Sequence, residues 1–143
     1  MAYVVHQYDA DPGASSYGAA TATALGVDPA RLFKTLVATV DGRLAVGIVP
    51  VAGSLDLKAL AMALGGKRGA MAEPAAAERS TGYVTGGISP FGQRSRLPMV
   101  VDASANDWPT IYVSGGRRGL QVEVAPEDLV RLTAATVAPI AGA

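Results

Sequence analysis

Residues 33–51, FKTLVATVDGRLAVGIVPV, decide the fold class of this chain. Two runs rich in apolar and β-branched residues, 33–40 and 43–51, flank the dipeptide Asp41-Gly42. Asp-Gly is typical of a type I′ turn, which joins two antiparallel strands because both of its central residues take positive φ. The stretch therefore predicts a β-hairpin, and it is the clearest local signal in the sequence.

Further strands and short helices are predicted on both sides of the hairpin. Strand composition is found at residues 3–8, 97–104, 110–116 and 119–125. Helices are predicted at 19–25, 54–66, 74–79 and 126–135. The first has Ser15 or Ser16 as its N-cap and ends at Gly26, and the second has Ser54 as its N-cap and ends at Gly65. Pro74 and Pro126 are the first residues of the other two. In the second of these helices, Leu57, Leu60, Ala61 and Leu64 share one face.

Strands outnumber helices, and they occur both as a hairpin and separated by helical segments. This arrangement predicts an α/β (α+β) fold with a mixed sheet rather than a regular parallel one. No repeat, low-complexity block or linker interrupts residues 1–143, so we expect a single domain.

The composition excludes several classes of protein. The 143 residues are 50% hydrophobic, with one histidine, no cysteine and a formal net charge of zero. Without cysteine there is no disulfide, thiolate nucleophile or zinc ribbon, and His6 alone cannot form a two-histidine metal site. We therefore expect no metal and no cofactor. The sequence has no apolar run of membrane-spanning length and no signal peptide pattern, so we expect a soluble, cytoplasmic protein with no membrane partner.

Charge is distributed unevenly despite the zero total. Residues 79–118 contain five arginines but only two acidic residues, Asp102 and Asp107. The arginines are Arg79, Arg94, Arg96, Arg117 and Arg118. A solvated surface is the ordinary interpretation, and a small phosphate-contacting surface is the sharper one. The surplus is too weak for a general nucleic-acid binder.

Lys34 is the most informative single residue. Along a strand it shares a face with Leu32, Leu36, Ala38 and Val40, whereas Thr35 points to the other side. Two interpretations stay open: a lysine near the end of a strand that reaches water, or a fixed cation at the edge of a pocket. In the second case its ammonium suits a developing oxyanion or a phosphate.

Two glycine pairs follow strand-like runs. The first lies in TGYVTGGISPFG (81–92), where Gly86 and Gly87 precede Ser89, and the second lies in VSGGRRGL (113–120), where Gly115 and Gly116 follow Ser114. Neither stretch is a P-loop or a nucleophile elbow. Backbone amides, hydroxyls and one lysine together predict a pocket that binds or polarises a carbonyl or ester.

Four stretches give the chain a resemblance to a known family: HQYDADP (6–12), LGVDPARLFKTLV (25–37), TGYVTGGISPFGQR (81–94) and TIYVSGGRRGLQVEVAPEDL (110–129). In these stretches the chain resembles the YbaK/EbsC family of bacterial aminoacyl-tRNA deacylases, which are relatives of the editing domain inserted in bacterial prolyl-tRNA synthetases. The stretches run in family order over almost the whole sequence. Members usually begin with a short helix ahead of the first strand, a segment with no counterpart before His6.

The resemblance implies a fold, a reaction and a set of residues. The fold is a mixed, barrel-like sheet surrounded by short helices. The reaction is removal of mischarged cysteine from tRNA for proline, with the substrate's own thiol attacking the ester and releasing a cyclic thiolactone. The essential lysine falls on Lys34, the aromatic pair that shapes the pocket on Tyr8 and Tyr17, the glycine loop on Gly86 and Gly87, and the serine on Ser114.

The leading hypothesis is therefore a trans-acting editing enzyme, formally a lyase or hydrolase, that takes the 3′ end of an aminoacyl-tRNA. In it Lys34 is catalytic, Ser89, Gly115 and Gly116 join the substrate-binding residues, and Arg94, Arg96, Arg117 and Arg118 contact nucleic acid. One alternative is a deacylase for another small amino acid, such as alanine, that uses water. Another is a non-catalytic accessory module that binds tRNA or prolyl-tRNA synthetase.

Overall fold

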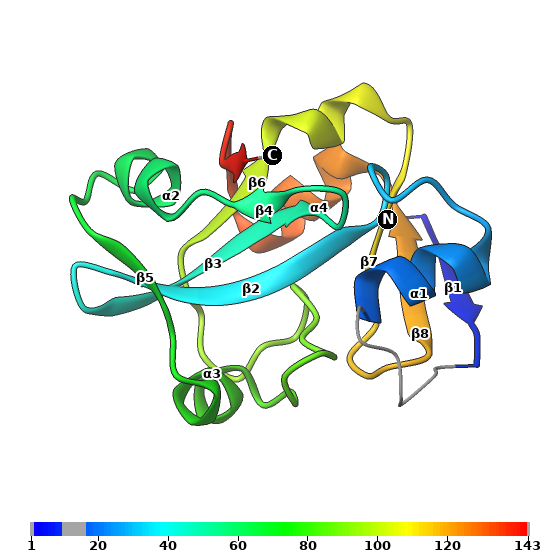
Figure 1. Ribbon diagram of the computed structural model, residues 1–143, viewed down its shortest axis with the longest axis horizontal. Helices are drawn as coiled ribbons and strands as arrows, with labels where there is room; N and C mark the ends of the chain where they lie inside the picture. Colours follow the sequence, from blue (N-terminus) through cyan, green and yellow to red (C-terminus); the bar gives the residue numbers. More distant parts are fainter. Residues whose placement is uncertain (1, 10–16, 143) are drawn as a thin grey trace.

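The computed structural model describes residues 2–9 and 17–142 (Figure 1). The helices in these residues are α1 (Tyr17–Leu25), α2 (Leu57–Ala63), α3 (Pro74–Thr81), the 3-10 helix η1 (Ala103–Asp107) and α4 (Pro126–Thr133). The strands are β1 (Tyr3–Gln7), β2 (Phe33–Val40), β3 (Arg43–Pro50), β4 (Ser54–Leu55), β5 (Gly69–Met71), β6 (Met99–Asp102), β7 (Ile111–Ser114), β8 (Leu120–Val124), β9 (Thr136–Ala138) and β10 (Ala141–Gly142). None of the described helices has the length and apolar character to cross a bilayer.

The predicted hairpin is confirmed and forms the centre of the larger sheet. Its turn has φ values of 52° at Asp41 and 84° at Gly42, as a type I′ turn requires. The five-stranded sheet has the order β5-β2-β3-β6-β9. β2 is antiparallel to β3 and β5, whereas β3–β6 and β6–β9 are parallel, so the prediction of a mixed sheet is also confirmed.

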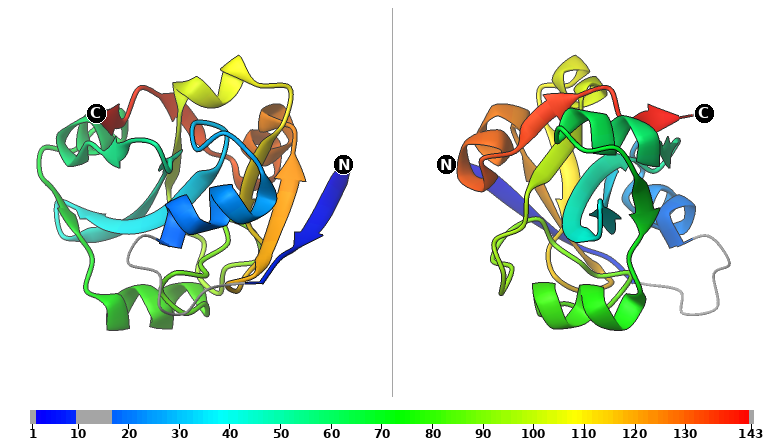
Figure 2. Two further views of the ribbon diagram at one scale, coloured as in Figure 1. Left: turned by 45° about the vertical axis from the view of Figure 1, so that its right-hand side comes forward. Right: turned by 90° about the vertical axis from the view of Figure 1, so that its left-hand side faces the viewer.

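The expectation of a barrel-like sheet is wrong. The described strands form three separate sheets, and a three-stranded antiparallel sheet, β1-β8-β7, stands beside the five-stranded one. A single parallel bridge between Leu32 and Tyr112 joins these two sheets. The strands do not close into a ring because β5 pairs with β2 only at Ala38–Val40, while β7 meets the chain just before β2 begins. Figure 2 shows β1 at the outer edge of the molecule.

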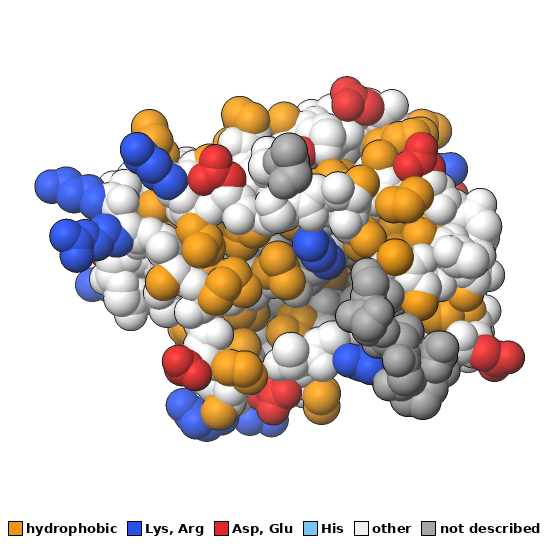
Figure 3. Space-filling model, viewed as in Figure 1, with side chains coloured by type: hydrophobic (Ala, Val, Ile, Leu, Met, Phe, Trp, Pro, Cys, Tyr) orange, Lys and Arg blue, Asp and Glu red, His pale blue; other side chains and the backbone are white. Residues whose placement is uncertain are grey.

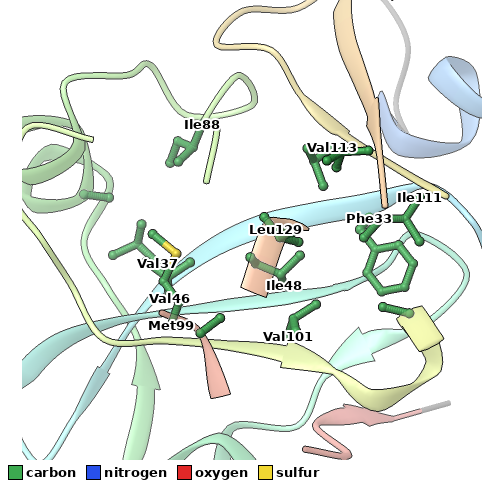
Figure 4. Close-up of a cluster of buried hydrophobic side chains, with 14 residues drawn as sticks. Phe33, Val37, Val46, Ile48, Ile88, Met99, Val101, Ile111, Val113 and Leu129 are labelled. Atoms are coloured by element: carbon green, nitrogen blue, oxygen red, sulfur yellow. The ribbon is translucent and has the colours of Figure 1, made fainter. Parts of the chain in front are cut away.

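The larger sheet is buried on both faces, because consecutive residues of its central strands point into two different cores. Figure 4 shows the first core, in which Phe33 and Val37 of β2 pack with Ile48 of β3 and Leu129 of α4. The intervening residues of β2 and β3 join Leu60 and Ala61 of α2 in the second core. This explains why β3 and β6 are almost continuously apolar instead of alternating.

The helices begin close to the predicted positions, with one correction. α2 is capped by Asp56, whose Oδ1 accepts a hydrogen bond of 3.0 Å from Ala59 N, and not by Ser54. Ser54 belongs to β4, which pairs with β10 near the end of the chain. Pro74 and Pro126 open α3 and α4 as predicted. The proposed caps Ser15 and Ser16 lie outside the described residues.

Asp102 attaches the C-terminal segment to the sheet. Its side chain is buried at the end of β6, and Oδ1 accepts hydrogen bonds from Ile140 N at 2.8 Å and Ala141 N at 2.9 Å. Oδ2 accepts from Ser104 N and Oγ. Burial raises the pKa of Asp102, but the hydrogen bonds from Ser104, Ile140 and Ala141 outweigh it and hold the pKa below its usual value.

Replacing this carboxylate should lower the free energy of unfolding in a pH-dependent way. Because the pKa of Asp102 is lower in the folded state, its stabilisation is complete above the unfolded value near 3.8 and is lost as the pH falls through the folded value. Asp102→Asn should cost about 2 kcal/mol at pH 7 by urea denaturation, and the difference from wild type should shrink below pH 4. The matched control is Asp107→Asn, at an exposed position. A pH-independent difference would contradict this account.

Candidate functional site

A cavity of about 490 Å³ lies between β2, the β5–α3 segment, α1 and the end of β7. Its wall is mostly apolar, with a few polar groups that come from separate segments, which is the usual form of a ligand site. The described residues that line it are Gly18, Thr21, Leu32, Phe33, Lys34, Thr35, Leu36, Val37, Val51, Met71, Ala72, Pro74, Ala77, Thr85, Gly86, Ile88, Ser114 and Gln121.

The cavity lies along an uncovered edge of β2. Val37 O accepts a hydrogen bond of 3.2 Å from Ala72 N, so the backbone polar groups of Val37 face the β5 side. Because these groups alternate sides along a strand, those of Thr35 face the same side. β5 pairs only with Ala38–Val40, and within the described chain no other strand pairs with Thr35 there. The Thr35 backbone groups therefore face the part of this side of β2 that β5 does not cover.

Lys34 is half-buried and lines this cavity, which favours the pocket-edge interpretation over a lysine that simply reaches solvent. Two residues further along the same face, Leu36 also lines the cavity. No carboxylate lies within ion-pair distance of Lys34 among the described residues. Its ammonium is thus available to an anionic or carbonyl group of a ligand.

The two glycine pairs, predicted separately from the sequence, pack against each other. A Cβ added to Gly86 would lie 2.9 Å from the guanidinium of Arg118, and one added to Gly87 would lie 2.9 Å from Arg117 Cα. At Gly87 the neighbour is backbone, so only glycine permits this close approach, and at Gly86 the positive φ of 92° favours glycine. Gly86 lines the cavity, so Arg118 lies next to a residue of the cavity wall.

Ser114 and Gln121 are neighbours across β7 and β8, and both line the cavity. Ser114 Oγ accepts a hydrogen bond of 3.2 Å from Gly116 N, which fixes the start of the second glycine loop. Gln121 is only 4% exposed and Thr35 only 7%. Gln121 Oε1 and Thr35 Oγ1 are buried with no hydrogen-bond partner, a costly condition that a ligand in the cavity can relieve.

Tyr8 reaches the cavity wall indirectly, and Tyr17 cannot be placed. Tyr8 lies just after β1, with its hydroxyl 3.1 Å from Oγ1 of the lining residue Thr21. Tyr17 is the first residue of α1, but its side chain lies outside the described part of the structure.

Four of the predicted substrate-binding residues, Gly87, Ser89, Gly115 and Gly116, do not line the cavity. Ser89 is 2% exposed, and its Oγ accepts a hydrogen bond from Phe91 N. Gly115 packs against Leu120, and Gly116 packs against the ring of Tyr83. These positions shape the loops that carry Gly86 and Ser114.

The four arginines predicted to contact nucleic acid have different neighbours. Arg117 and Arg118 pack on the first glycine loop, next to the cavity. Arg94 lies against Gly82 at the end of α3. Arg96 lines a second, smaller cavity of about 220 Å³.

His6 belongs to a different cluster. Its Nε2 lies 3.0 Å from Glu123 Oε1, and the other oxygen of Glu123 is 3.3 Å from Arg31. Hydrogen bonds from Thr110 and His6, together with the nearby Arg31, hold the pKa of Glu123 below its usual value despite burial. In the strand pairing, Gln121 of β8 lies opposite His6 of β1 on one side and Ser114 of β7 on the other. His6 and Ser114 are therefore two strand spacings apart, or roughly 10 Å. This imidazole is not placed to activate the Ser114 hydroxyl.

Gln121, Thr35 and Thr21 are cavity residues that the sequence interpretation missed. Each sits in an ordinary strand or helix pattern, and nothing local marks it. The available signal was position in the sequence: Gln121 follows shortly after the second glycine pair, and Thr35 is next to Lys34. The described residues contain no cluster of three acidic, histidine or cysteine side chains that could hold a metal ion.

Comparison with known proteins agrees with this architecture. The family model described as the aminoacyl-tRNA editing domain matches residues 11–132. EbsC of Enterococcus faecalis, named for Cys-tRNA(Pro)/Cys-tRNA(Cys) deacylase activity, is 41% identical over 114 residues, which cover 78% of this chain and 69% of EbsC.

Solved structures share the fold over 99% of this chain. One, described as a trans-editing enzyme for prolyl-tRNA synthetase, has a TM-score of 0.86 at 25% identity, with 87% of its own chain covered. A scaffold protein used for computational epitope grafting has a TM-score of 0.87 at 23% identity, also with 87% covered, and shows the fold alone. The family match over most of the sequence, together with the identity to EbsC, establishes that the chain belongs to the aminoacyl-tRNA editing domain family, as its resemblance to the YbaK/EbsC proteins predicts.

Proposed function

We propose that this protein is a trans-acting deacylase that removes cysteine from mischarged tRNA for proline. The observation that carries the proposal is the shared cavity of Lys34, Gly86 and Ser114, three residues that the family resemblance marks and that come from β2, a glycine loop and β7. The name of EbsC, a relative at 41% identity, supports the substrate, and the trans-editing structural neighbour supports action on a tRNA released by prolyl-tRNA synthetase.

The polar groups of the described cavity wall suit ester binding. The lining residues that carry them are Lys34 with its ammonium, Thr21, Thr35, Thr85 and Ser114 with their hydroxyls, and Gln121 with its carboxamide. In the proposed reaction Lys34 stabilises the negative charge that develops on the ester carbonyl oxygen. Ser114 and the glycine loop hold the terminal ribose and the ester next to it.

The substrate supplies the nucleophile in this mechanism. The cysteine sulfur attacks the carbonyl carbon of its own ester, a C–S bond forms, and the bond from that carbon to the ribose oxygen breaks. The ribose oxygen takes up the proton that the thiol loses. The products are tRNA with a free terminal hydroxyl and a cyclic thiolactone, which water then opens to free cysteine.

Gln121 is proposed to bind the substrate's α-ammonium group. It carries the one side-chain carbonyl among the described lining residues, and its oxygen lacks a partner. A half-turn about its Cγ–Cδ bond exchanges oxygen and nitrogen, so the group can turn an acceptor toward an ammonium donor. A bound ammonium would supply the missing hydrogen bond.

Removing the Lys34 ammonium should abolish most of the activity. Lys34→Ala is expected to reduce kcat for release of cysteine from charged tRNA by about 100-fold or more, the usual effect of losing an oxyanion-stabilising group. The value of kcat is measured from the release of labelled cysteine. Arg131→Ala, which removes an exposed cation on α4, is the control for loss of positive charge. Full activity in Lys34→Ala would refute the assignment.

The nucleophile can be tested with substrates that differ by one atom. Cysteine, serine and alanine are each attached to the same tRNA for proline, and deacylation rates are compared. If the substrate thiol attacks, the serine and alanine forms should react at least about 100-fold more slowly, because neither presents a thiol. Equal rates for all three would favour attack by water and a deacylase for small amino acids in general.

The role of Gln121 predicts a change that depends on the substrate amine. Gln121→Met keeps the side-chain length but removes the carbonyl, and it should raise KM for cysteinyl-tRNA about tenfold, the value of one hydrogen bond to a charged group. For N-acetyl-cysteinyl-tRNA, which lacks the ammonium, wild type and variant should have the same KM. Gln7→Met, at an exposed position of β1, is the control. An equal rise in KM for both substrates would point to a structural role.

A further inference from the structure

A second basic surface lies at the end of the molecule that carries the β2–β3 turn. It consists of Arg43 on β3, Lys58 on α2, and Lys67 and Arg68 on the loop between α2 and β5, and we call it the hairpin-end patch. All four side chains are exposed. Figure 3 shows Lys and Arg side chains gathered at this end, on the left of the view.

The patch holds a third of the chain's positive charge. It has four of the twelve Lys and Arg residues, and between residues 41 and 72 only Asp41 and Asp56 oppose them. Among the described residues none of the four cations forms an ion pair. In a protein with zero net charge, such an unbalanced end creates a local positive potential that attracts an anionic partner.

The loop that carries Lys67 and Arg68 is held in place by the hairpin turn. The Asp41 carboxylate accepts hydrogen bonds from Lys67 N at 3.1 Å and Arg68 N at 2.9 Å, and Asp41 N donates to Arg68 O at 2.8 Å. These backbone hydrogen bonds, with Lys67 and Arg68 nearby, lower the pKa of Asp41. The two cations are therefore displayed from a fixed backbone, which lowers the entropic cost of binding a rigid partner.

The patch and the cavity are connected by one strand. Lys34, at the cavity, and Val40, next to the turn, are six positions apart on β2, or about 20 Å at roughly 3.3 Å per residue. A tRNA whose 3′ end enters the cavity carries a phosphate backbone away from it along the protein surface. The hairpin end is within reach of that backbone.

We propose that the hairpin-end patch binds phosphates of the acceptor arm of the tRNA whose charged end occupies the cavity. This inference rests on the proposed function and adds the surface that holds the body of the substrate. Lysine and arginine contacts to phosphates supply affinity and orientation without reading sequence.

The test compares a whole substrate with its reacting end alone. Wild type and the double variant Lys67→Ala/Arg68→Ala are assayed with cysteinyl-tRNA for proline and with cysteinyl-adenosine, which fits the cavity but has no acceptor arm. The variant should lose roughly tenfold in kcat/KM for the tRNA and nothing for the adenosine ester. The slope of log affinity against log salt for uncharged tRNA, measured by fluorescence anisotropy, should fall by about 2.

Two controls separate charge from structure. The exchange variant Lys67→Arg/Arg68→Lys keeps both charges and both backbone N–H groups, and it should behave as wild type. Arg131→Ala removes a cation on α4 and should leave the tRNA results unchanged. Because the Asp41 hydrogen bonds involve only backbone groups of residues 67 and 68, the substitutions preserve the loop.

Each outcome has one interpretation. If the double variant matches wild type on tRNA in both assays, or loses activity only when prolyl-tRNA synthetase is added, the patch does not bind the acceptor arm. If it loses activity equally on tRNA and on cysteinyl-adenosine, the effect is on the cavity and the inference is also overturned. Wild type that deacylates neither substrate would instead refute the proposed function.

Discussion

The candidate site depends on the incomplete pairing of strand β2. On one side β2 pairs with β3 along its whole length, but on the other side β5 covers only Ala38–Val40. The strand cannot shift to close this gap, because its alternate residues are fixed in two cores, Phe33 and Val37 in one and Ala38 and Val40 in the other. The rigid strand therefore keeps an open edge, and the cavity lies along it.

The same constraint explains why the site needs segments that are distant in sequence. An open strand edge offers main-chain groups and one row of side chains, here including Lys34, and the opposite wall must come from elsewhere. The glycine loop at Gly86 can approach because Gly87 lies directly on the backbone of Arg117. Ser114 and Gln121 arrive on the separate three-stranded sheet. Each segment adds one or two polar groups to an otherwise apolar wall.

The cavity wall has few polar groups, which is consistent with a reaction in which the protein mainly binds and polarises an ester. His6 is engaged with Glu123 two strands away from Ser114. Asp102, the most buried carboxylate of the described residues, holds the C-terminal segment. His6, Glu123 and Asp102 are thus engaged in structural contacts, while Lys34 stays accessible in the cavity and the cations at Arg43, Lys67 and Arg68 stay accessible at the hairpin end.

The sequence by itself determined the features that depend on neighbouring residues. Asp41-Gly42 sufficed for the hairpin turn, Pro74 and Pro126 for two helix starts, and the quoted motifs for the family. It did not reveal β5, β9 and β10, which have only two or three residues each and exist because distant partners pair with them. The pairing of Ser54 with β10, the open sheet, the unpartnered oxygens of Thr35 and Gln121 and the basic hairpin end were likewise decided by the tertiary structure. Each of these depends on which distant segment lies opposite a residue, and local pattern carries no information about that.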